Sequence, residues 1–320
     1  MNNSKKIIKR LPREDLIKEL TPERFLRPTR IGNNEIYIFS AIECPNLMRE
    51  VGRLRELTFR DAGAGFGKEV DIDHYDTDEY SCKQLIVWSP SNNEIIRGYR
   101  FNIFYDLKEK LIQDIPLVNK SIYDFSDDFV SDYMPYLAEL SRAFIQPMYQ
   151  PKNAGRKAAF SLDNIWDGLG ALVIKYPFLK YFFGRITFFS NYNSTVRDSI
   201  FYFFQKHLKG DASLLKAKEP HDLVTSNSYL KKRINSLVEK EDFKSLQIIA
   251  KEHNTIIPPL IKSYYNASSS LKVFEPVFDS YFGSSYAAGI IVTMEDIYPS
   301  FVKRYIEPYE NYLKMNRYNG

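Results

Sequence analysis

The sequence predicts a mixed β-sheet with helices on both faces, in the α/β or α+β class. Short apolar strands alternate with amphipathic helical segments along the chain. A Pro/Ser/Asn-rich turn at residues 89–93 separates two strand-like runs, which predicts a hairpin. The length of 320 residues allows about two ordinary domains or one enlarged domain.

Local periodicity predicts the elements in chain order. Residues 35–42 predict a strand, and Pro45 opens a helix to about residue 60, with apolar residues at helical spacing. The hairpin strands follow at 83–88 and 94–104. Residues 210–255 are polar and of mixed charge, which predicts one or two surface helices. The remaining expectations are strands at 136–149, 182–190 and 286–293, a helix at 163–175 with Asp163 as N-cap, and a helix at 194–208 capped by Ser194.

Charge and composition indicate how the chain is organised. Residues 1–31 hold nine Lys or Arg and four acids, so we expect a basic N-terminal arm. We interpret residues 32–320 as a single enlarged domain with a helical insertion at about 210–255. The basic residues of this arm indicate either a peripheral contact with an anionic membrane face or only a solvated segment. It lacks interleaved aromatics and a reading module, so we expect no nucleic-acid partner.

Other counts exclude several classes of protein. The net charge is +4 and 44% of residues are hydrophobic, as in soluble globular proteins. Cys44 and Cys82 sit in no metal or redox pattern, which suits a reducing compartment. No apolar run reaches the roughly 20 residues of a membrane helix, and no signal-peptide core is evident. These features predict a cytoplasmic protein, with any membrane contact peripheral, on the inner face.

A series of short motifs runs through the chain in a fixed order. Residues 53–100 contain R-x-x-x-F-R, a glycine-bearing loop, D-x-D-x-Y-D and a strand ending G-Y-R. ELSR follows at 139–142, NIWDG at 164–168, FGRITFF at 183–189 and IPPLIKSY at 257–264. Together they resemble the hemolysin-like and ornithine-lipid or glycine-lipid N-acyltransferases, relatives of the acyl-homoserine-lactone synthases. The IPPLIKSY segment favours the lipid branch.

The resemblance implies a GNAT fold, with a mostly antiparallel sheet flanked by helices. It also implies transfer of a long acyl chain, 3-hydroxylated in this family, to the α-amine of a small amino acid, glycine or ornithine. The product would be the precursor of an aminolipid. Two other functions stay open: a non-catalytic lipid- or membrane-binding protein, and a synthase of the homoserine-lactone type.

Amide formation from a thioester needs a neutral amine and a polarised carbonyl held close together. Glu139, on a predicted central strand, is the candidate base, or it pairs structurally with Arg142 or Arg100. A backbone N–H at a bulge of this strand would polarise the carbonyl.

The acidic loop supplies two further candidate catalytic residues. Asp71 and Asp73 lie on one side of an extended segment and could bind the acceptor ammonium or pair with arginines that close the loop. Arg100 or Arg142 could hold the acceptor carboxylate in a bidentate fork, or join that ion-pair network. A Mg²⁺ or Ca²⁺ site is a third interpretation of the acids, but the loop lacks a calcium-hand pattern, and we expect no metal.

The donor is inferred from the segment after this strand. Residues 150–158, QPKNAGRKA, keep little of the glycine-rich loop that binds the coenzyme A pyrophosphate in GNAT enzymes. Lys152, Arg156 and Lys157 form a basic cluster that would steer acidic acyl carrier protein. We therefore expect acyl carrier protein, with its phosphopantetheine thioester, as donor and partner in preference to acyl-coenzyme A, and no bound cofactor. The Phe-rich strand with Tyr264 and Tyr265 could line an acyl tunnel or pack in the core.

Overall fold

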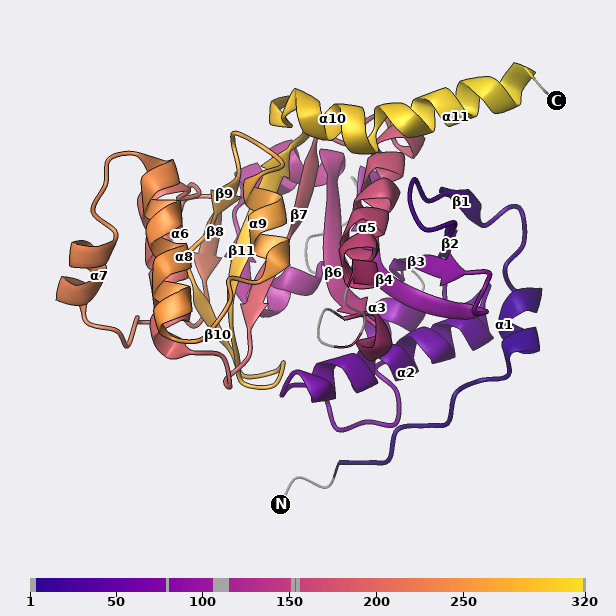
Figure 1. Ribbon diagram of the computed structural model, residues 1–320, viewed down its shortest axis with the longest axis horizontal. Helices are drawn as coiled ribbons and strands as arrows, with labels where there is room; N and C mark the ends of the chain where they lie inside the picture. Colours follow the sequence, from indigo (N-terminus) through magenta and orange to yellow (C-terminus); the bar gives the residue numbers. More distant parts are fainter. Residues whose placement is uncertain (1–3, 79–80, 106–114, 151–152, 154–155, 319–320) are drawn as a thin grey trace. The chain divides into compact units, whose positions relative to one another are not determined.

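Figure 1 shows the computed structural model, which describes residues 4–78, 81–105, 115–150, 153 and 156–318. Side chains are described for these residues except 156–162 and 317–318. The chain folds into two compact units. Unit 1 comprises Met1–Val118, Ala138–Leu179 and Pro299–Gly320, and unit 2 comprises Asn119–Leu137 and Lys180–Tyr298. The predicted class, a largely antiparallel sheet flanked by helices, is confirmed. The single domain over 32–320 stays a prediction.

Unit 1 is built on an antiparallel sheet. Its strands in spatial order are β1 (Phe25–Pro28), β2 (Glu35–Phe39), β3 (Lys83–Ser89), β4 (Glu94–Ile103) and β6 (Leu137–Ile145). Every neighbouring pair is antiparallel. The predicted hairpin is confirmed as β3 and β4, with Gln84 opposite Arg100. These two side chains therefore share one face of the sheet.

The two long helices of unit 1, α2 (Pro45–Asp61) and α5 (Arg156–Lys175), cover opposite faces of this sheet. Arg55 of α2 donates to Gln84 at 2.5 Å. On α5, a Cβ added at Gly168 would lie only 2.8 Å from Leu85 Cδ2, so the helix packs directly on β3. Gln84 and Leu85 are successive residues of one strand, so their side chains point to opposite faces.

The C-terminal helices of unit 1, α10 (Pro299–Tyr305) and α11 (Glu307–Tyr318), pack on α5. The Trp166 and Phe301 rings meet edge to face at 4.8 Å. The Asp163 carboxylate accepts a 2.6 Å hydrogen bond from the Tyr305 hydroxyl. Asp163 lies inside α5, so the prediction that it caps the helix is wrong. The helix begins earlier because residues 156–162 are mostly strong helix formers.

The predicted N-terminal arm also contains regular structure. Helix α1 (Arg13–Lys18) and edge strand β1 both fall within residues 1–31. Before them the backbone runs beside the glycine-bearing loop, with Lys5 N–H donating to Gly67 O at 2.8 Å and Ile8 N–H to Glu69 O at 3.2 Å. Residues 4–28 therefore contribute contacts and an edge strand to unit 1.

Unit 2 has its own antiparallel strands. β10 (Val277–Asp279) pairs with β11 (Ser285–Thr293), and β11 pairs with both β7 (Tyr181–Phe188) and the short β9 (Lys272–Val273). Beside them, β5 (Tyr123–Phe125) and β8 (Leu215–Ala217) form a small antiparallel sheet. The helices are α6 (Ser194–His207), α7 (Asn227–Arg233), α8 (Glu239–Glu252) and α9 (Pro259–Tyr265).

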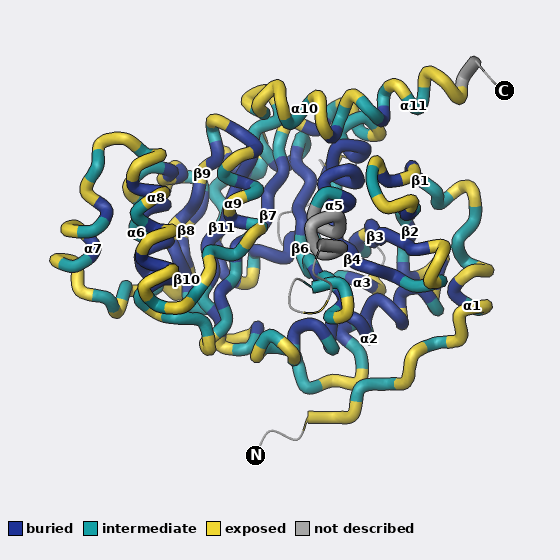
Figure 2. Tube along the Cα trace, viewed as in Figure 1, coloured by how far each residue is buried: buried dark blue, intermediate teal, exposed yellow. Residues whose placement is uncertain are grey.

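Aromatic side chains fill the core of unit 2 on both faces of β7. Phe188 meets Phe201 of α6 edge to face at 5.2 Å. Phe183 faces the other way, 5.5 Å from Phe129. Phe183 and Phe188 are at most 2% exposed. The core interpretation of the Phe-rich strand is thus confirmed at these two positions, and Figure 2 shows β7 as a mixture of buried and intermediate residues.

The predicted boundaries differ from the observed ones in several places. The strand expected at 136–149 ends at Ile145, and Pro147–Tyr149 forms the 3-10 turn η6, since Pro147 cannot donate to a ladder. Helix α6 is capped by Asn193, whose side chain accepts from the Val196 N–H. Residues 210–255 do contain the expected helices, α7 and α8, together with β8. The remaining short elements are α3 (His74–Thr77), η3 (Val118–Ser121), η4 (Phe129–Tyr133), η5 (Met134–Tyr136) and η7 (Met294–Asp296).

None of the helices in the described ranges combines the length and apolar character that crossing a bilayer requires.

Candidate functional site in unit 1

The candidate acids and arginines converge on the face of the unit 1 sheet that α2 covers. Arg55 comes from α2, the acidic residues from the loop around α3, and Arg100 from β4. On β6, Glu139 lies opposite Asn102 and Ser141 opposite Arg100. Strand alternation therefore places Glu139, Ser141 and Arg100 on one face. We call Arg55, Asp71, Asp73, Asp76, Arg100 and Arg142 the acid–arginine cluster.

Asp76 is the buried centre of this cluster. Its carboxylate accepts from Arg55 Nη1 at 3.0 Å, from Arg100 Nη1 at 3.3 Å and from Gln84 Nε2 at 3.0 Å. Burial alone would raise the pKa of Asp76, but the Arg55 and Arg100 guanidinium groups outweigh it and hold the pKa at about 2. Asp76 is therefore a fixed anion that fastens the acidic loop to the sheet and to α2.

Arg100 is held by several protein groups through Nη1 and Nε, whereas its buried Nη2 has no hydrogen-bond partner among the described residues. Its Nη1 lies 2.5 Å from Asp73 Oδ1, and its Nε donates to Ser141 Oγ at 3.0 Å. Its guanidinium carbon lies 5.2 Å from the centre of the Tyr75 ring. Burial lowers its pKa, but Asp76 and Asp73 more than reverse this and raise it. Arg100 is 0% exposed, so the loop-bracing alternative describes its contacts.

Asp73 is the member of the cluster that reaches solvent, with its side chain 20% exposed. It begins the short helix α3 in a reciprocal capping arrangement with Asp76, which fixes the turn of the loop. Its second oxygen accepts from Arg142 Nη2 at 3.3 Å. The geometry leaves this carboxylate at the surface of an otherwise buried ion-pair network.

Asp71 and Arg142 form a second, nearly dry pair. Arg142 Nε lies 3.1 Å from Asp71 Oδ2, and Asp71 is 1% exposed. Burial raises the pKa of Asp71 and lowers the pKa of Arg142 to about 10, because it disfavours both charges. The Asp71 N–H donates to Gly52 O at 2.9 Å on α2, where an added Cβ would crowd Ile72 at 2.7 Å.

Glu139 lies on the same face but is held differently. It is 1% exposed, and its Oε2 accepts from the Val118 backbone N–H at 2.8 Å. The Glu139 charge raises the pKa values of Tyr75 and Cys82, secondary to the burial that raises both. Glu139 is thus close to the acid–arginine cluster, as expected of a shared site. The predicted roles of all five candidate catalytic residues stay predictions.

Strand β6 carries a bulge directly after Ser141. Arg100 pairs with Ser141 and Gly98 with Phe144, so Arg142 and Ala143 together face the single residue Tyr99. Arg142 has a φ of +50°, a left-handed conformation that is unfavourable for a side-chain-bearing residue by roughly 1–2 kcal/mol. Such bulges break the regular ladder and recur next to active sites. The bulge expected in this strand is therefore present, in the ELSR segment.

The side chains of the predicted basic cluster are not among those that the structure describes. Lys152 lies outside the described residues, and Arg156 and Lys157 belong to the first turn of α5, where side chains are not described. Three residues around Arg100 were not predicted from the sequence as part of the site: Gln84, Ser141 and Tyr75. Gln84 could have been found from the register of the β3–β4 hairpin, where it faces Arg100, whereas Ser141 faces Arg100 from β6, which is not part of that hairpin.

A metal-binding arrangement of three or more His, Cys, Asp or Glu side chains does not occur among the described residues. The carboxylates of the acidic loop are instead neutralised by guanidinium groups, with Asp71, Asp73 and Asp76 each within 3.3 Å of one.

Comparison with known proteins identifies the family of this domain. Residues 54–157, from α2 through the start of α5, match the family model of the acetyltransferase (GNAT) domain. No solved structure matches the chain significantly. The segment that holds the acid–arginine cluster and the bulge is therefore a GNAT acyltransferase domain.

Two curated proteins extend the match to nearly the whole chain. The chain is 40% identical over 313 residues to the glycine N(alpha)-acyltransferase of Bacteroides thetaiotaomicron, covering 97% of this chain and 93% of that protein. It is 37% identical to the protein of the same name from Phocaeicola vulgatus, covering 95% and 93%. The chain belongs to this family of GNAT N-acyltransferases, as the motif resemblance predicted.

Proposed function

We propose that the protein transfers a long acyl chain, 3-hydroxylated as the family resemblance implies, from acyl carrier protein to the α-amine of glycine. The observation that carries the proposal is the β6 bulge at Arg142, set beside Glu139 and Ser141 in a chain whose relatives are named glycine N(alpha)-acyltransferases. The names of those relatives favour glycine over ornithine as acceptor. The product would be an N-acylglycine.

The reaction forms one bond and breaks one. The neutral amine of glycine attacks the thioester carbonyl carbon, the C–N bond forms, and the C–S bond breaks when the tetrahedral intermediate collapses. The amine nitrogen loses a proton, and the departing pantetheine sulfur is protonated. A backbone N–H at the bulge, aimed at the thioester oxygen, would stabilise the oxyanion, which is the most effective contribution that such a site makes.

Glu139 is the proposed proton acceptor, directly or through a water. The hydrogen bond from Val118 N–H favours the ionised carboxylate, the form that accepts a proton. Its burial at 1% exposure excludes bulk water from the reacting amine, which keeps the amine neutral once it is deprotonated. The alternative of a structural ion pair with Arg100 or Arg142 predicts loss of stability instead of loss of turnover.

The acid–arginine cluster is proposed to bind the amino group of the acceptor through Asp73. Asp73 has an exposed face, whereas Asp71 and Asp76 are at most 1% exposed and paired. Arg100 and Arg142 then act by holding the loop that carries Asp73, since Arg100 is bonded to Asp73, Asp76 and Ser141. The acidic loop as a whole positions one carboxylate.

Acyl carrier protein is proposed as the donor and partner because the segment before α5 keeps little of a pyrophosphate-binding loop. Lys152, Arg156 and Lys157 would attract its acidic surface. We propose cytoplasmic acyl transfer with peripheral membrane contact through the N-terminal residues, where Lys5, Lys6 and Lys9 are exposed.

The test is product identification with purified protein. Acyl carrier protein loaded with 3-hydroxypalmitate is incubated with glycine, ornithine or serine, and products are identified by mass spectrometry. N-acylglycine as the main product, with coenzyme A thioester a poorer donor, supports the proposal. Transfer to ornithine in preference to glycine would contradict the acceptor assignment. Release of free fatty acid alone, or binding without turnover, would favour the non-catalytic lipid-binding function.

A further inference from the structure

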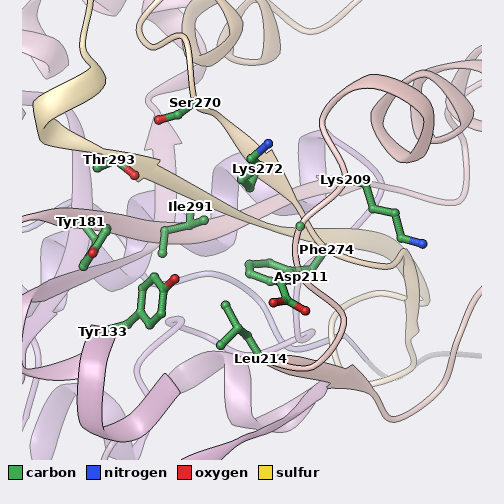
Figure 3. Close-up of a pocket in the computed structure, with 11 residues that line it drawn as sticks. Tyr133, Tyr181, Lys209, Asp211, Leu214, Ser270, Lys272, Phe274, Ile291 and Thr293 are labelled. Carbon is green, nitrogen blue, oxygen red and sulfur yellow. The ribbon is translucent and has the colours of Figure 1, made fainter. Parts of the chain in front are cut away.

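Unit 2 contains a cavity of about 500 Å³ that has no place in the chemistry proposed for unit 1. Its floor is the sheet face that carries Ile291 and Thr293 of β11, and Tyr133 and Phe274 form further walls (Figure 3). The volume lies within the range of roughly 300–1,000 Å³ that small-molecule sites occupy. The cavity is therefore large enough for a ligand with a long apolar part.

The apolar lining continues into the aromatic core. Tyr133 stacks on Phe129 at 5.4 Å and an interplanar angle of 6°. Phe274 lies 6.3 Å from Phe183, which itself lies 5.5 Å from Phe129. Since rings fill the space beneath the lining, the walls are firmly supported and suit an alkyl chain.

Two lysines border this cavity, Lys209 before β8 and Lys272 on β9, and Figure 3 shows the Lys209 side chain extending away from the other labelled residues. Both are exposed, and within the described ranges neither ammonium has a carboxylate within 4.0 Å. Lys272 pairs in register with Ile291, so the two residues lie directly opposite each other on neighbouring strands. The lining also contains one acid, Asp211, but its Oδ1 accepts from the Ser213 N–H at 2.9 Å and hydroxyl at 2.7 Å. The cavity is thus bordered by two lysines that have no carboxylate partner among the described residues. Its one carboxylate, Asp211, is hydrogen-bonded within a local turn.

We propose that this cavity binds an acyl amphiphile with an anionic head, of the class of N-acyl amino acids, with the chain on the floor and the carboxylate at the rim that Lys209 and Lys272 border. The ligand class rests on the proposed function, because an N-acylglycine is its product, but the site is separate from the acid–arginine cluster. It would act as a binding site for the product or for a related lipid anion.

The experiment measures equilibrium binding to the full chain without a donor, so its outcome is independent of acyl transfer. The probes are N-dodecanoylglycine and its uncharged amide, N-dodecanoylglycinamide, titrated by calorimetry below their micellar concentrations. We expect the acid to bind at one site, about tenfold or more tightly than the amide, with the preference shrinking at high salt. Equal binding of acid and amide would overturn the proposal.

Variants locate the site. The double variant Lys209→Glu, Lys272→Glu should abolish the preference for the acid, whereas Lys244→Glu, an exposed lysine of α8 outside the cavity, should preserve it. Leu214→Trp should fill the cavity and weaken both probes. Unchanged binding in the double lysine variant would overturn the proposal, even if Leu214→Trp fails to fold. Acyl transfer without such binding would refute this site alone.

Discussion

The charged groups of unit 1 and those around the cavity of unit 2 are held in opposite ways. In unit 1, Asp76 and Arg100 are buried and bonded to several fixed partners. In unit 2, Lys209 and Lys272 are exposed, and no carboxylate of the described residues lies within ion-pair distance of their ammonium groups. Buried charges that satisfy one another fix geometry, whereas exposed charges attract ligands in a salt-dependent way. Removing charges should therefore lower the stability of unit 1, whereas in unit 2 it should weaken ligand binding.

The largest expected effect is on stability, at Arg55. Arg55→Met leaves Asp76 without its main partner in a dry site, so we expect a loss of about 3–5 kcal/mol in the free energy of unfolding. The matched control is Arg10→Met, which breaks a partly exposed pair with Glu94 and should change stability by less than about 1 kcal/mol. Urea denaturation measures both. Similar losses in the two variants would mean that burial does not distinguish these ion pairs.

The next effect concerns Arg100, whose planar fork contacts Asp73 and Ser141. Arg100→Lys keeps the charge but loses the fork, so the loop should loosen. We expect kcat and the KM values of both substrates to worsen together, by about tenfold in kcat/KM, with a lower Tm. Steady-state kinetics with glycine and the acyl donor varied separately provide the measurement. A rise confined to the KM of glycine would instead place Arg100 in the acceptor site.

A smaller effect is expected from the basic cluster. Reversing the charges of Lys152, Arg156 and Lys157 should reduce kcat/KM for acyl carrier protein several-fold at low ionic strength. The loss should shrink at high salt, because attraction between exposed charges is screened beyond roughly 8–10 Å. The coenzyme A thioester serves as the control donor and should be affected much less. A reduction of equal size for both donors, unaffected by salt, would remove the carrier-protein steering role.

The smallest effect is on the pH dependence of stability, as distinct from the overall loss that unpairing the buried Arg55 and Arg100 causes. The folded pKa of Asp76, about 2, lies below its ordinary value of 3.8, so its ionised form stabilises the fold above pH 4. That contribution is lost as the pH falls from about 4 towards 2. Asp76→Asn should therefore lower stability at pH 6 and flatten the decline between pH 4 and 2, measured by Tm at each pH. An unchanged slope would mean that other carboxyls govern the decline.

Much of the fold could be predicted because the deciding signals are local. The turn at 89–93 and the apolar alternation around it predict the β3–β4 hairpin, and apolar residues at helical spacing predict α2. The start of α5 could not be read from a cap signal, because an Asp inside the helix binds Arg304 and Tyr305 from the C-terminus. That contact depends on tertiary structure.

The candidate site could likewise be predicted only in part. The residue types and the pairing of acids with arginines could be predicted from the motifs. Which acid stays exposed could not, since Asp71 and Asp73 are two residues apart and differ only in what packs over them. The bulge at Arg142 is equally invisible in the sequence, because a positive φ at arginine carries no composition signal. The cavity of unit 2 joins residues from β7, β9, β11 and η4, which no motif links.

Acyl transfer by Glu139→Gln provides the most direct test of the central claim, that a buried carboxylate beside the β6 bulge deprotonates the amine. Glutamine keeps the shape and can still accept from Val118 N–H but cannot take up the proton. With saturating acyl carrier protein thioester and glycine, we expect turnover to fall by roughly 10²–10⁴-fold while Tm stays near that of the unmutated protein. A folded variant with near-full turnover would contradict the account.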